Sequence, residues 1–465
     1  MAKLLLKTVF LSFLALISIK LLGNLFTEER RGDIVWNNFY ELQEDNLDVI
    51  FLGNSLSYSS FNPLIFNSYS EINSYNLGFA SQNIKQAYHV LKEALAYQSP
   101  QVVVLEAYTL DIIDNSEEDR LGFKFENLNS QRVSLRKLVS INDQFSSLQN
   151  KVNAAFPLVR NHDNWREIHK IRQTPQTKPK EDRFLGFKAT DRNLDKKKLS
   201  EALKRLPKTH SFSEENKYYF ERTVELCKRN GIRLVVVRAP VLLSKYNAEY
   251  YKDVNLNTKE LCSDFKIRYI DYNIKFHELG LSEGSYFDGL HLNYRGATKI
   301  SEILSKELDF NHSKKKTKNP TAPEDFIYSS KYDNLAQTIF KGGFNIDNNT
   351  IVKEVKLVRL RENEISVIVK LDKSLKTNDI AKYNVGYYFY PVDSEETLLE
   401  TEKDLKRKYT SSGGPSVPMQ FNDNYYVTLR SHKTKVKKFK KIKIQLYNKE
   451  GVYGESLLIN NILFK

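Results

Sequence analysis

Cysteine is scarce in this chain of 465 residues, which contains only Cys227 and Cys262. Two cysteines are too few for a disulfide-rich scaffold or for a zinc site of the CxxC type. Each lies in a stretch with helical periodicity, so the pair is expected either as two small core residues or as one disulfide bond.

The sequence also lacks the motifs that hold metals and nucleotides. It contains neither a glycine-rich phosphate loop of the Walker type nor the glycine fingerprint of dinucleotide-binding domains. The paired histidines that bind zinc on one helix of metalloproteases are missing too. Four further histidines show no metal-ligand spacing: His89, His162, His169 and His277. The chemistry expected here therefore needs no cofactor and no metal.

Acidic residues are fewer than basic ones: the chain has 57 Asp and Glu residues and 71 Lys and Arg residues, which gives a formal net charge of +14. This balance suits anionic partners such as lipid head groups and acidic glycans. No nucleic-acid recognition motif accompanies it, and the basic residues are spread along most of the chain. Nucleic acid is therefore not expected as a partner.

The N-terminus has no long uncharged apolar run. The apolar stretch 4–26 is interrupted by Lys7 and Lys20, and its uncharged centre, residues 8–19, is only twelve residues long, which also fits the core of a signal peptide. No small-x-small cleavage site follows, so a retained single-pass anchor within residues 1–30 is favoured over a cleaved signal. Its lysines would place the bulk of the protein on the extracytoplasmic side, periplasmic or extracellular.

Residues 31–310 alternate strand-like apolar runs with amphipathic stretches. This alternation predicts a three-layer α/β domain with a largely parallel sheet. The expected strands are Val49–Leu52, Ser74–Leu77, Val102–Leu105, Ile232–Val237 and Arg268–Ile270. A charged insertion, residues 111–209, interrupts the pattern and is expected to form a helical lid or side wall.

Residues 311–330, with Pro320 and Pro323, are typical of a linker. Residues 331–465 then show short alternating runs separated by turn residues, which predicts a β-rich accessory domain resembling a small β-sandwich. The expected strands are Ile365–Leu371, Val385–Tyr390, Tyr425–Leu429 and Lys441–Tyr447. Seven lysines between positions 433 and 443 are expected either on a solvated hairpin or in contact with an anionic polymer.

Two short motifs, far apart in the sequence, carry reactive groups. Gly53-Asn-Ser55 follows a buried strand, which places Ser55 on a tight turn at the strand's end. Asp288-Gly-Leu-His291 precedes an amphipathic helix, and its spacing lets both side chains converge. A serine becomes nucleophilic when an imidazole takes its proton and a carboxylate orients that imidazole. The sequence thus predicts a catalytic triad of Ser55, His291 and Asp288.

The two motifs resemble the first and last blocks of the SGNH (GDSL-type) hydrolase superfamily, with Asn54 in place of the usual aspartate. The resemblance covers residues 45–310 with gaps. It implies an SGNH-type, flavodoxin-like domain and a serine esterase or O-acyltransferase that uses no cofactor. The second block resembles residues 76–83, in which the donor to the oxyanion is either Gly78 or Ser81, beside the backbone N–H of Ser55.

The third block departs from the superfamily pattern. Relatives carry an asparagine donor where this chain has Val104-Leu-Glu106-Ala-Tyr108. An ionised Glu106 would repel an oxyanion, so either Tyr108 or Asn83 is expected to supply the missing donor, or the oxyanion hole is weaker than usual.

Within the insertion, residues 156–165 combine bulky aromatic side chains with Arg160 and His162. This segment is expected either to dock onto the core as a helix or to form a substrate-facing wall above Ser55, together with Glu106 and Tyr108. The segment and the altered third block resemble membrane-anchored bacterial SGNH-like proteins of cell-envelope polysaccharide acylation.

The expected function is therefore that of a membrane-tethered serine esterase or O-acyltransferase. Its expected substrate is an acylated, chiefly acetylated, surface polysaccharide or glycolipid, and its expected partners are the membrane and a membrane acyltransferase. The alternative from another class is a catalytically inactive SGNH-like protein that binds glycan or assists such an acyltransferase.

Overall fold

The computed structural model describes Lys7, residues 30–70, 72–161, 184–188, 190, 194–204, 210–308 and 310, and in the C-terminal part residues 337–348, 350–361, 364–372, 384–391, 419–421, 424–430, 439–448 and 451–462. The expected anchor, apart from Lys7 and Arg30, and the expected linker lie outside these residues. Among the described residues, no helix combines the length and the apolar character that a membrane span needs.

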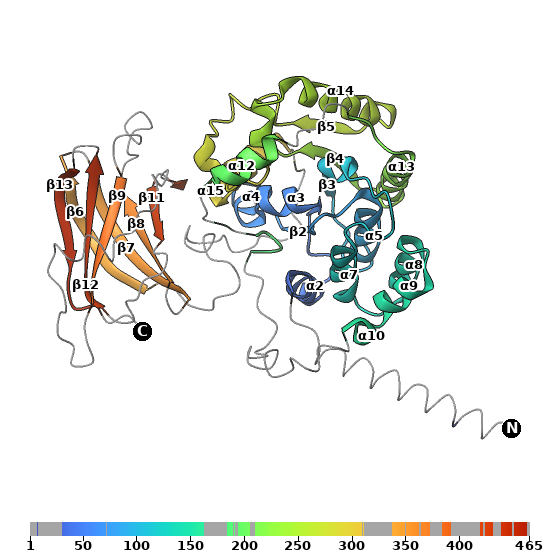
Figure 1. Ribbon diagram of the computed structural model, residues 1–465, viewed down its shortest axis with the longest axis horizontal. Coiled ribbons are helices and arrows are strands. Elements are labelled where there is room, and N and C mark those ends of the chain that lie inside the picture. Colours follow the sequence, from blue (N-terminus) through green and yellow to red (C-terminus); the bar gives the residue numbers. More distant parts are fainter. Residues whose placement is uncertain are drawn as a thin grey trace.

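Five parallel strands form the central sheet of the first part of the chain, which confirms the α/β prediction (Figure 1). They are β1 (Val49–Gly53), β2 (Ser74–Gly78), β3 (Val102–Glu106), β4 (Arg233–Arg238) and β5 (Arg268–Asp271). Their order in the sheet is β2-β1-β3-β4-β5. In such doubly wound sheets the crossovers change direction at the second and third strands of this order, and ligands bind beside the carboxyl ends there. That point lies between β1 and β3.

Alternating side chains of the strands supply two cores, one on each face of the sheet. Val49 and Phe51 of β1 pack into one cluster and Ile50 and Leu52 into the other. The first face is covered by α3 (Ser55–Ser60), α4 (Pro63–Ser70) and α15 (Tyr294–Glu307). The second is covered by α2 (Arg31–Glu41), α5 (Ile84–Ala94) and α13 (Glu214–Arg229).

The described part of this domain also contains two other helices near the sheet and two short 3-10 turns. They are α14 (Ala248–Asp264), α12 (Lys196–Leu203), η2 (Leu242–Lys245) and η3 (Glu283–Ser285). Cys227 of α13 and Cys262 of α14 are buried and free, so the disulfide alternative was wrong and both are core residues.

The insertion begins with helices, as expected. After α6 (Tyr108–Asp111) come α7 (Leu121–Asn129), α8 (Leu135–Gln144), α9 (Leu148–Ala155) and α10 (Pro157–Asn161). A small core of its own holds this helical group together: Phe125, Leu128, Ile141, Phe145 and Ala154. The group stands at one edge of the domain, beside α2 and α5 (Figure 1).

The C-terminal part is built from two antiparallel sheets, in the orders β10-β11-β8-β7-β6 and β13-β12-β9. The strands are β6 (Gln337–Asp347), β7 (Thr350–Arg361), β8 (Glu364–Leu371), β9 (Asn384–Pro391), β10 (Met419–Phe421), β11 (Asn424–Arg430), β12 (Phe439–Asn448) and β13 (Gly451–Ile459). One buried cluster takes side chains from both sheets, among them Val355, Val369 and Ile444. Of the lysine-rich stretch, only the part from residue 439 onward is described, and it forms the start of β12.

Candidate active site

Ser55 lies at the turn between β1 and α3, and the turn has room only for glycine at position 53. Gly53 has a φ of +145°, and a Cβ atom there would come within 2.7 Å of the Glu106 Cβ atom. Asn54 then caps α3, because its side-chain oxygen accepts a hydrogen bond from the backbone N–H of Leu56 at 2.8 Å. Glycine and asparagine thus build the turn, and Ser55 is the first residue of the helix.

Asp288 and His291 lie on a tight loop before α15. Both ends of the loop are fixed, since Tyr286 and Leu292 form a β-bridge and Asn293 caps α15. The Oδ1 atom of Asp288 accepts hydrogen bonds from the backbone N–H groups of Leu290 and His291, each at 2.8 Å. The carboxylate is therefore held by the loop itself.

The structure brings Ser55, His291 and Asp288 together. The Oγ atom of Ser55 lies 2.8 Å from the Nε2 atom of His291, and Nδ1 of the same ring lies 2.9 Å from Oδ2 of Asp288. Burial raises the pKa of Asp288, but hydrogen bonds from His291 and the loop amides outweigh burial and leave the pKa below its ordinary value. Asp288 is therefore ionised at neutral pH and acts as an acceptor for the Nδ1–H group.

Two of the four candidate oxyanion donors are engaged elsewhere. The backbone N–H of Gly78 donates to the side-chain oxygen of Asn76 at 2.9 Å. The amide nitrogen of Asn83 donates to Asp114 at 2.9 Å, and its oxygen caps α5. Ser81 differs, because it has a left-handed φ of +53° in the loop between β2 and α5. For the backbone N–H groups of Ser55 and Ser81, the described residues provide no hydrogen-bond acceptor.

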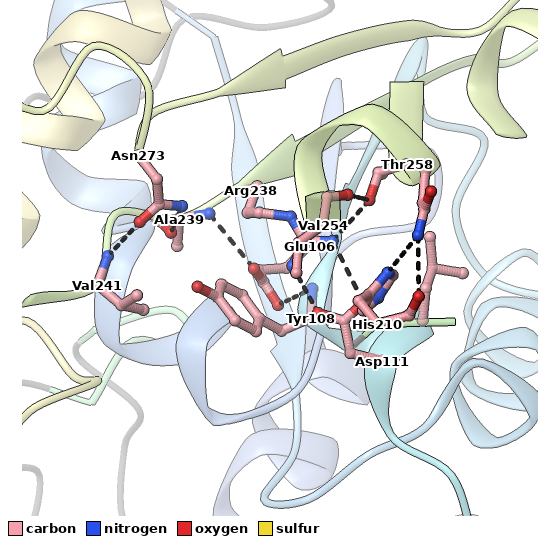
Figure 2. Close-up of polar contacts among 12 residues, drawn as sticks. Glu106, Tyr108, Asp111, His210, Arg238, Ala239, Val241, Val254, Thr258 and Asn273 are labelled. Atoms are coloured by element: carbon pink, nitrogen blue, oxygen red, sulfur yellow. Dashed lines mark hydrogen bonds and ion pairs between the residues drawn. The ribbon is translucent and has the colours of Figure 1, made fainter. Parts of the chain in front are cut away.

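Glu106 is fully buried at the end of β3, and its carboxyl group accepts hydrogen bonds from the backbone N–H groups of Tyr108 and Ala239 at 3.1 and 3.3 Å. Burial raises the pKa of Glu106 to about 8. The group is therefore mainly neutral at pH 7, so the expected repulsion of an oxyanion does not apply there. The Tyr108 ring packs against the Arg238 guanidinium, 4.7 Å away, and its buried hydroxyl has no hydrogen-bond partner among the described residues (Figure 2). Its expected role as an oxyanion donor therefore stays a prediction.

A buried network next to Glu106 was not foreseen from the sequence. Arg238, fully buried at the end of β4, donates to both carboxylate oxygens of Asp111 at 2.5 and 3.2 Å and to Thr258 at 2.8 Å (Figure 2). His210 contacts Asp111 at 3.0 Å through Nε2. The network ties α6 and α14 to the ends of the strands. The sequence signal that could have predicted this network is a charged residue at the end of an apolar strand, as at Glu106 and Arg238.

Two other buried polar groups follow the strands on either side of β1: Thr109 lies in α6 after β3, and Gln82 lies in the loop between β2 and α5. The Oγ1 atom of Thr109 and the amide group of Gln82 have no hydrogen-bond partner among the described residues. Thr109 is close to the turn that carries Ser55, since a Cβ atom on Gly53 would lie 3.0 Å from Oγ1. Nothing in the sequence marked either residue.

Arg160 does not approach Ser55 in the described contacts. Its guanidinium stacks on Phe125 of α7 at 4.4 Å and donates to the carbonyl oxygen of Asn153 on α9 at 3.3 Å. The described start of the segment 156–165 therefore docks onto the helical group, which is the docking alternative. His162 lies outside the described residues.

Comparisons with known proteins add little to this picture. A search of the curated proteins finds no match. A family model without a functional description matches residues 190–312, the stretch that contains Asp288 and His291. Among solved structures, the chain is similar to a candidate acylhydrolase from Bacteroides fragilis, at 15% identity and a TM-score of 0.29, over 58% of this chain and 92% of that one. A likeness this distant carries no argument, so the function has to rest on the site.

Proposed function

We propose that the protein is an SGNH-type serine esterase or O-acyltransferase. The observation that supports it most directly is the contact of the Ser55 hydroxyl with Nε2 of His291 at 2.8 Å, while Nδ1 faces an ionised Asp288. With the Nδ1 hydrogen donated to Asp288, Nε2 carries the lone pair that accepts the hydroxyl hydrogen of Ser55. The order of the sheet, with Ser55 at the crevice between β1 and β3, favours the same assignment.

The proposed reaction passes through a covalent acyl-enzyme. Ser55 Oγ attacks the ester carbonyl and His291 takes its proton, which gives a tetrahedral oxyanion. The ester bond then breaks, and the leaving alcohol receives the proton from His291. In the second half, water or a sugar hydroxyl gives its proton to His291 and attacks the acyl-enzyme, which releases the acyl group and restores the Ser55 hydroxyl.

The oxyanion is assigned to the backbone N–H groups of Ser55 and Ser81, with the Thr109 hydroxyl as a further donor close to the turn. Each such donor contributes on the order of 100-fold in rate in characterised sites. A neutral Glu106 leaves this arrangement intact at pH 7. In the proposed mechanism, Glu106 is therefore compatible with catalysis at the position where SGNH relatives carry an asparagine.

The proposed substrate is an acylated, chiefly acetylated, envelope polysaccharide or glycolipid outside the cytoplasm, next to a membrane that holds residues 1–30. Basic side chains near the site favour an acidic glycan as the substrate. The first turn of α12 carries Lys196, Lys197 and Lys198, and the backbone N–H of Asp195 before it donates to Phe287, the neighbour of Asp288, at 3.1 Å. A membrane acyltransferase would fit as the donor of acyl groups, and the C-terminal sheets as a contact for the polymer.

A fluorophosphonate probe tests the proposal, because it modifies only an activated serine. The full-length protein in detergent is expected to be labelled at Ser55, as read by peptide mass spectrometry, and heat-denatured protein is not. Ser59→Ala is the matched control, since Ser59 lies on the same short helix and contacts only the Leu56 carbonyl oxygen at 3.5 Å. It should label like the unaltered protein.

Absence of labelling would favour the alternative function, an SGNH-like protein that binds glycan or assists an acyltransferase without catalysis. Two observations favour this alternative. Gly78 and Asn83 already donate hydrogen bonds within the protein, and glutamate stands in place of the third-block asparagine. Binding to acetylated glycan without loss of acetate would then be the result to look for.

Glu106 provides a pH prediction. Because its pKa is about 8, activity is expected to fall about tenfold between pH 7 and 9 as the carboxylate forms near the oxyanion. Glu106→Gln should keep the activity at pH 7 within about threefold and lose this alkaline decline. Glu93→Gln, at another buried glutamate outside the site, should retain the decline. An alkaline decline that persists in Glu106→Gln would contradict the assignment.

The same pKa fixes the sign of the effect on stability. The folded protein keeps a proton on Glu106 that the unfolded chain releases above its ordinary pKa of 4.5. The free energy of unfolding therefore decreases from about pH 4.5 to pH 8, and urea titrations of Glu106→Gln should show a smaller decrease.

A further inference from the structure

Helix α8 turns most of its apolar side chains away from the protein. Leu135, Leu138 and Val139 lie three and four residues apart, on one side of the helix, with exposed fractions of 80%, 52% and 52%. A surface helix ordinarily presents its apolar stripe to the core and its charges to water. In α8, three of the four large apolar side chains face water instead, and only Ile141 enters the small core of the helical group.

The inward side of α8 carries the charges instead. Arg136 donates through Nε to the buried Glu93 of α5 at 2.8 Å. Asp143 contacts the buried His89 of the same helix at 2.6 Å, and the hydrogen bond from His89 lowers the pKa of Asp143 to about 2. Because polar pairs fix α8 to α5, the outward leucines are not needed for its attachment.

The neighbouring helix extends the exposed surface. Leu148 at the start of α9 is 76% exposed, and Lys151 one turn later donates to Asn142 of α8 at 2.8 Å, which joins the two helices along this side. We call Val133, Leu135, Leu138, Val139 and Leu148 the apolar face of α8 and α9. Of the five Lys or Arg residues within 130–161, Arg136 pairs inward with Glu93 and Lys137 is buried, whereas Arg132 and Lys151 are at least partly exposed. The one acidic residue of this stretch, Asp143, points inward.

Helix α2, with which the described α/β domain begins, ends beside this face. Arg30 forms an ion pair with Glu126 of α7 at 3.9 Å. At the other end of α2, the Arg132 guanidinium lies over the ring of Tyr40, 4.3 Å from its centre. Helix α2 has 11 residues and is therefore roughly 16 Å long. The apolar stretch 4–26 precedes Arg30 directly in the sequence. A membrane that holds this stretch would lie within reach of the apolar face.

We propose that the apolar face of α8 and α9 docks onto the surface of an anionic lipid membrane. The apolar side chains enter the boundary between head groups and acyl chains, and Arg132 and Lys151 attract anionic lipids, the combination by which amphipathic helices bind membranes. The inference rests on the part of the proposed function that anchors residues 1–30. It adds a second membrane contact, which fixes the orientation of the catalytic domain above the bilayer.

The test uses full-length protein in vesicles with anionic lipid, carrying Leu138→Cys labelled with an environment-sensitive fluorophore. Native Cys227 and Cys262 do not compete, because both are buried and burial raises the pKa of each thiol to about 12. Leu256→Cys on α14 is the matched control, since Leu256 and Leu138 have nearly equal exposed fractions, 51% and 52%.

The label at position 138 is expected to shift its emission to the blue and to be quenched by nitroxide groups on the lipid chains. The label at position 256 is expected to keep the emission spectrum that it has in water. No quenching at 138, or equal quenching at both positions, would overturn the proposal. A shift at 138 that grows with protein density and lacks lipid quenching would assign the face to a second protein and overturn it too.

The same preparation separates this proposal from the proposed function. Resistance to extraction by alkaline carbonate reports the N-terminal anchor, and hydrolysis of p-nitrophenyl acetate reports the chemistry. Each can fail while the fluorescence result stands.

Discussion

Replacement of Ser55 by alanine is expected to lower kcat/KM for p-nitrophenyl acetate by at least about 100-fold, and losses of about 10⁶-fold in kcat occur when the nucleophile of a complete triad is removed. The reason is that the Oγ atom, 2.8 Å from His291, is the group that forms the acyl-enzyme in the proposed reaction. Steady-state hydrolysis by full-length protein measures the effect. Folding should be preserved, because alanine fits the first turn of α3.

Ser59→Ala, at a buried serine one turn further along α3, is the control and should stay within about threefold of the unaltered protein. Activity that survives Ser55→Ala would mean that the measured hydrolysis comes from another group. The triad would then be excluded as the source of catalysis.

Asp288→Asn is expected to lower kcat by about 10⁴-fold, the loss found when a triad aspartate becomes an amide. The loop explains why. Two backbone N–H groups require an oxygen at the Oδ1 position, so the new NH₂ group must face Nδ1 of His291. Nδ1 then has to accept a hydrogen bond, which moves the ring hydrogen to Nε2 and leaves no lone pair for Ser55.

Asp195→Asn is the matched control, because Asp195 is a nearby carboxylate whose role is to cap α12. Its kcat should remain within a few-fold of the unaltered protein. If Asp288→Asn kept more than about a tenth of the activity, the tautomer of His291 would not depend on Asp288, and the proposed mechanism would be wrong.

Much of the α/β domain was predictable from the sequence, because its strands are buried on both faces. Each of the five expected strands forms, with ends within one residue of the expected positions. The contact among Ser55, His291 and Asp288 also occurs as expected, since a glycine turn after β1 and an Asp-x-x-His loop before α15 are local features. Their catalytic role stays a prediction.

The C-terminal sheets were predicted only in part, because their strands are irregular. The expected β8, β9, β11 and β12 form, whereas β6, β7, β10 and β13 were not foreseen. Register shifts along β7, such as that between Val352 and Glu354, break the alternation of buried residues that marks a strand. In β13, which pairs with β12, a shift between Tyr453 and Leu457 does the same.

The oxyanion donors could not be chosen from the sequence for a different reason. Gly78 and Asn83 were reasonable candidates, but their hydrogen-bonding groups are taken by Asn76 and Asp114, partners that only the folded chain reveals. Likewise, the charge of Glu106 depends on its burial, which no motif records.

The helix that follows His291 is also the last element of its domain. Ser301 of α15 accepts a hydrogen bond from the backbone N–H of Asn62 at 2.8 Å. This bond holds α15 against the segment that follows Ser55. The nucleophile and its base are 236 positions apart. If the proposed reaction is correct, the growing polypeptide would remain inert toward esters until α15 has been made and has docked, so a product truncated before His291 would carry no reactive serine.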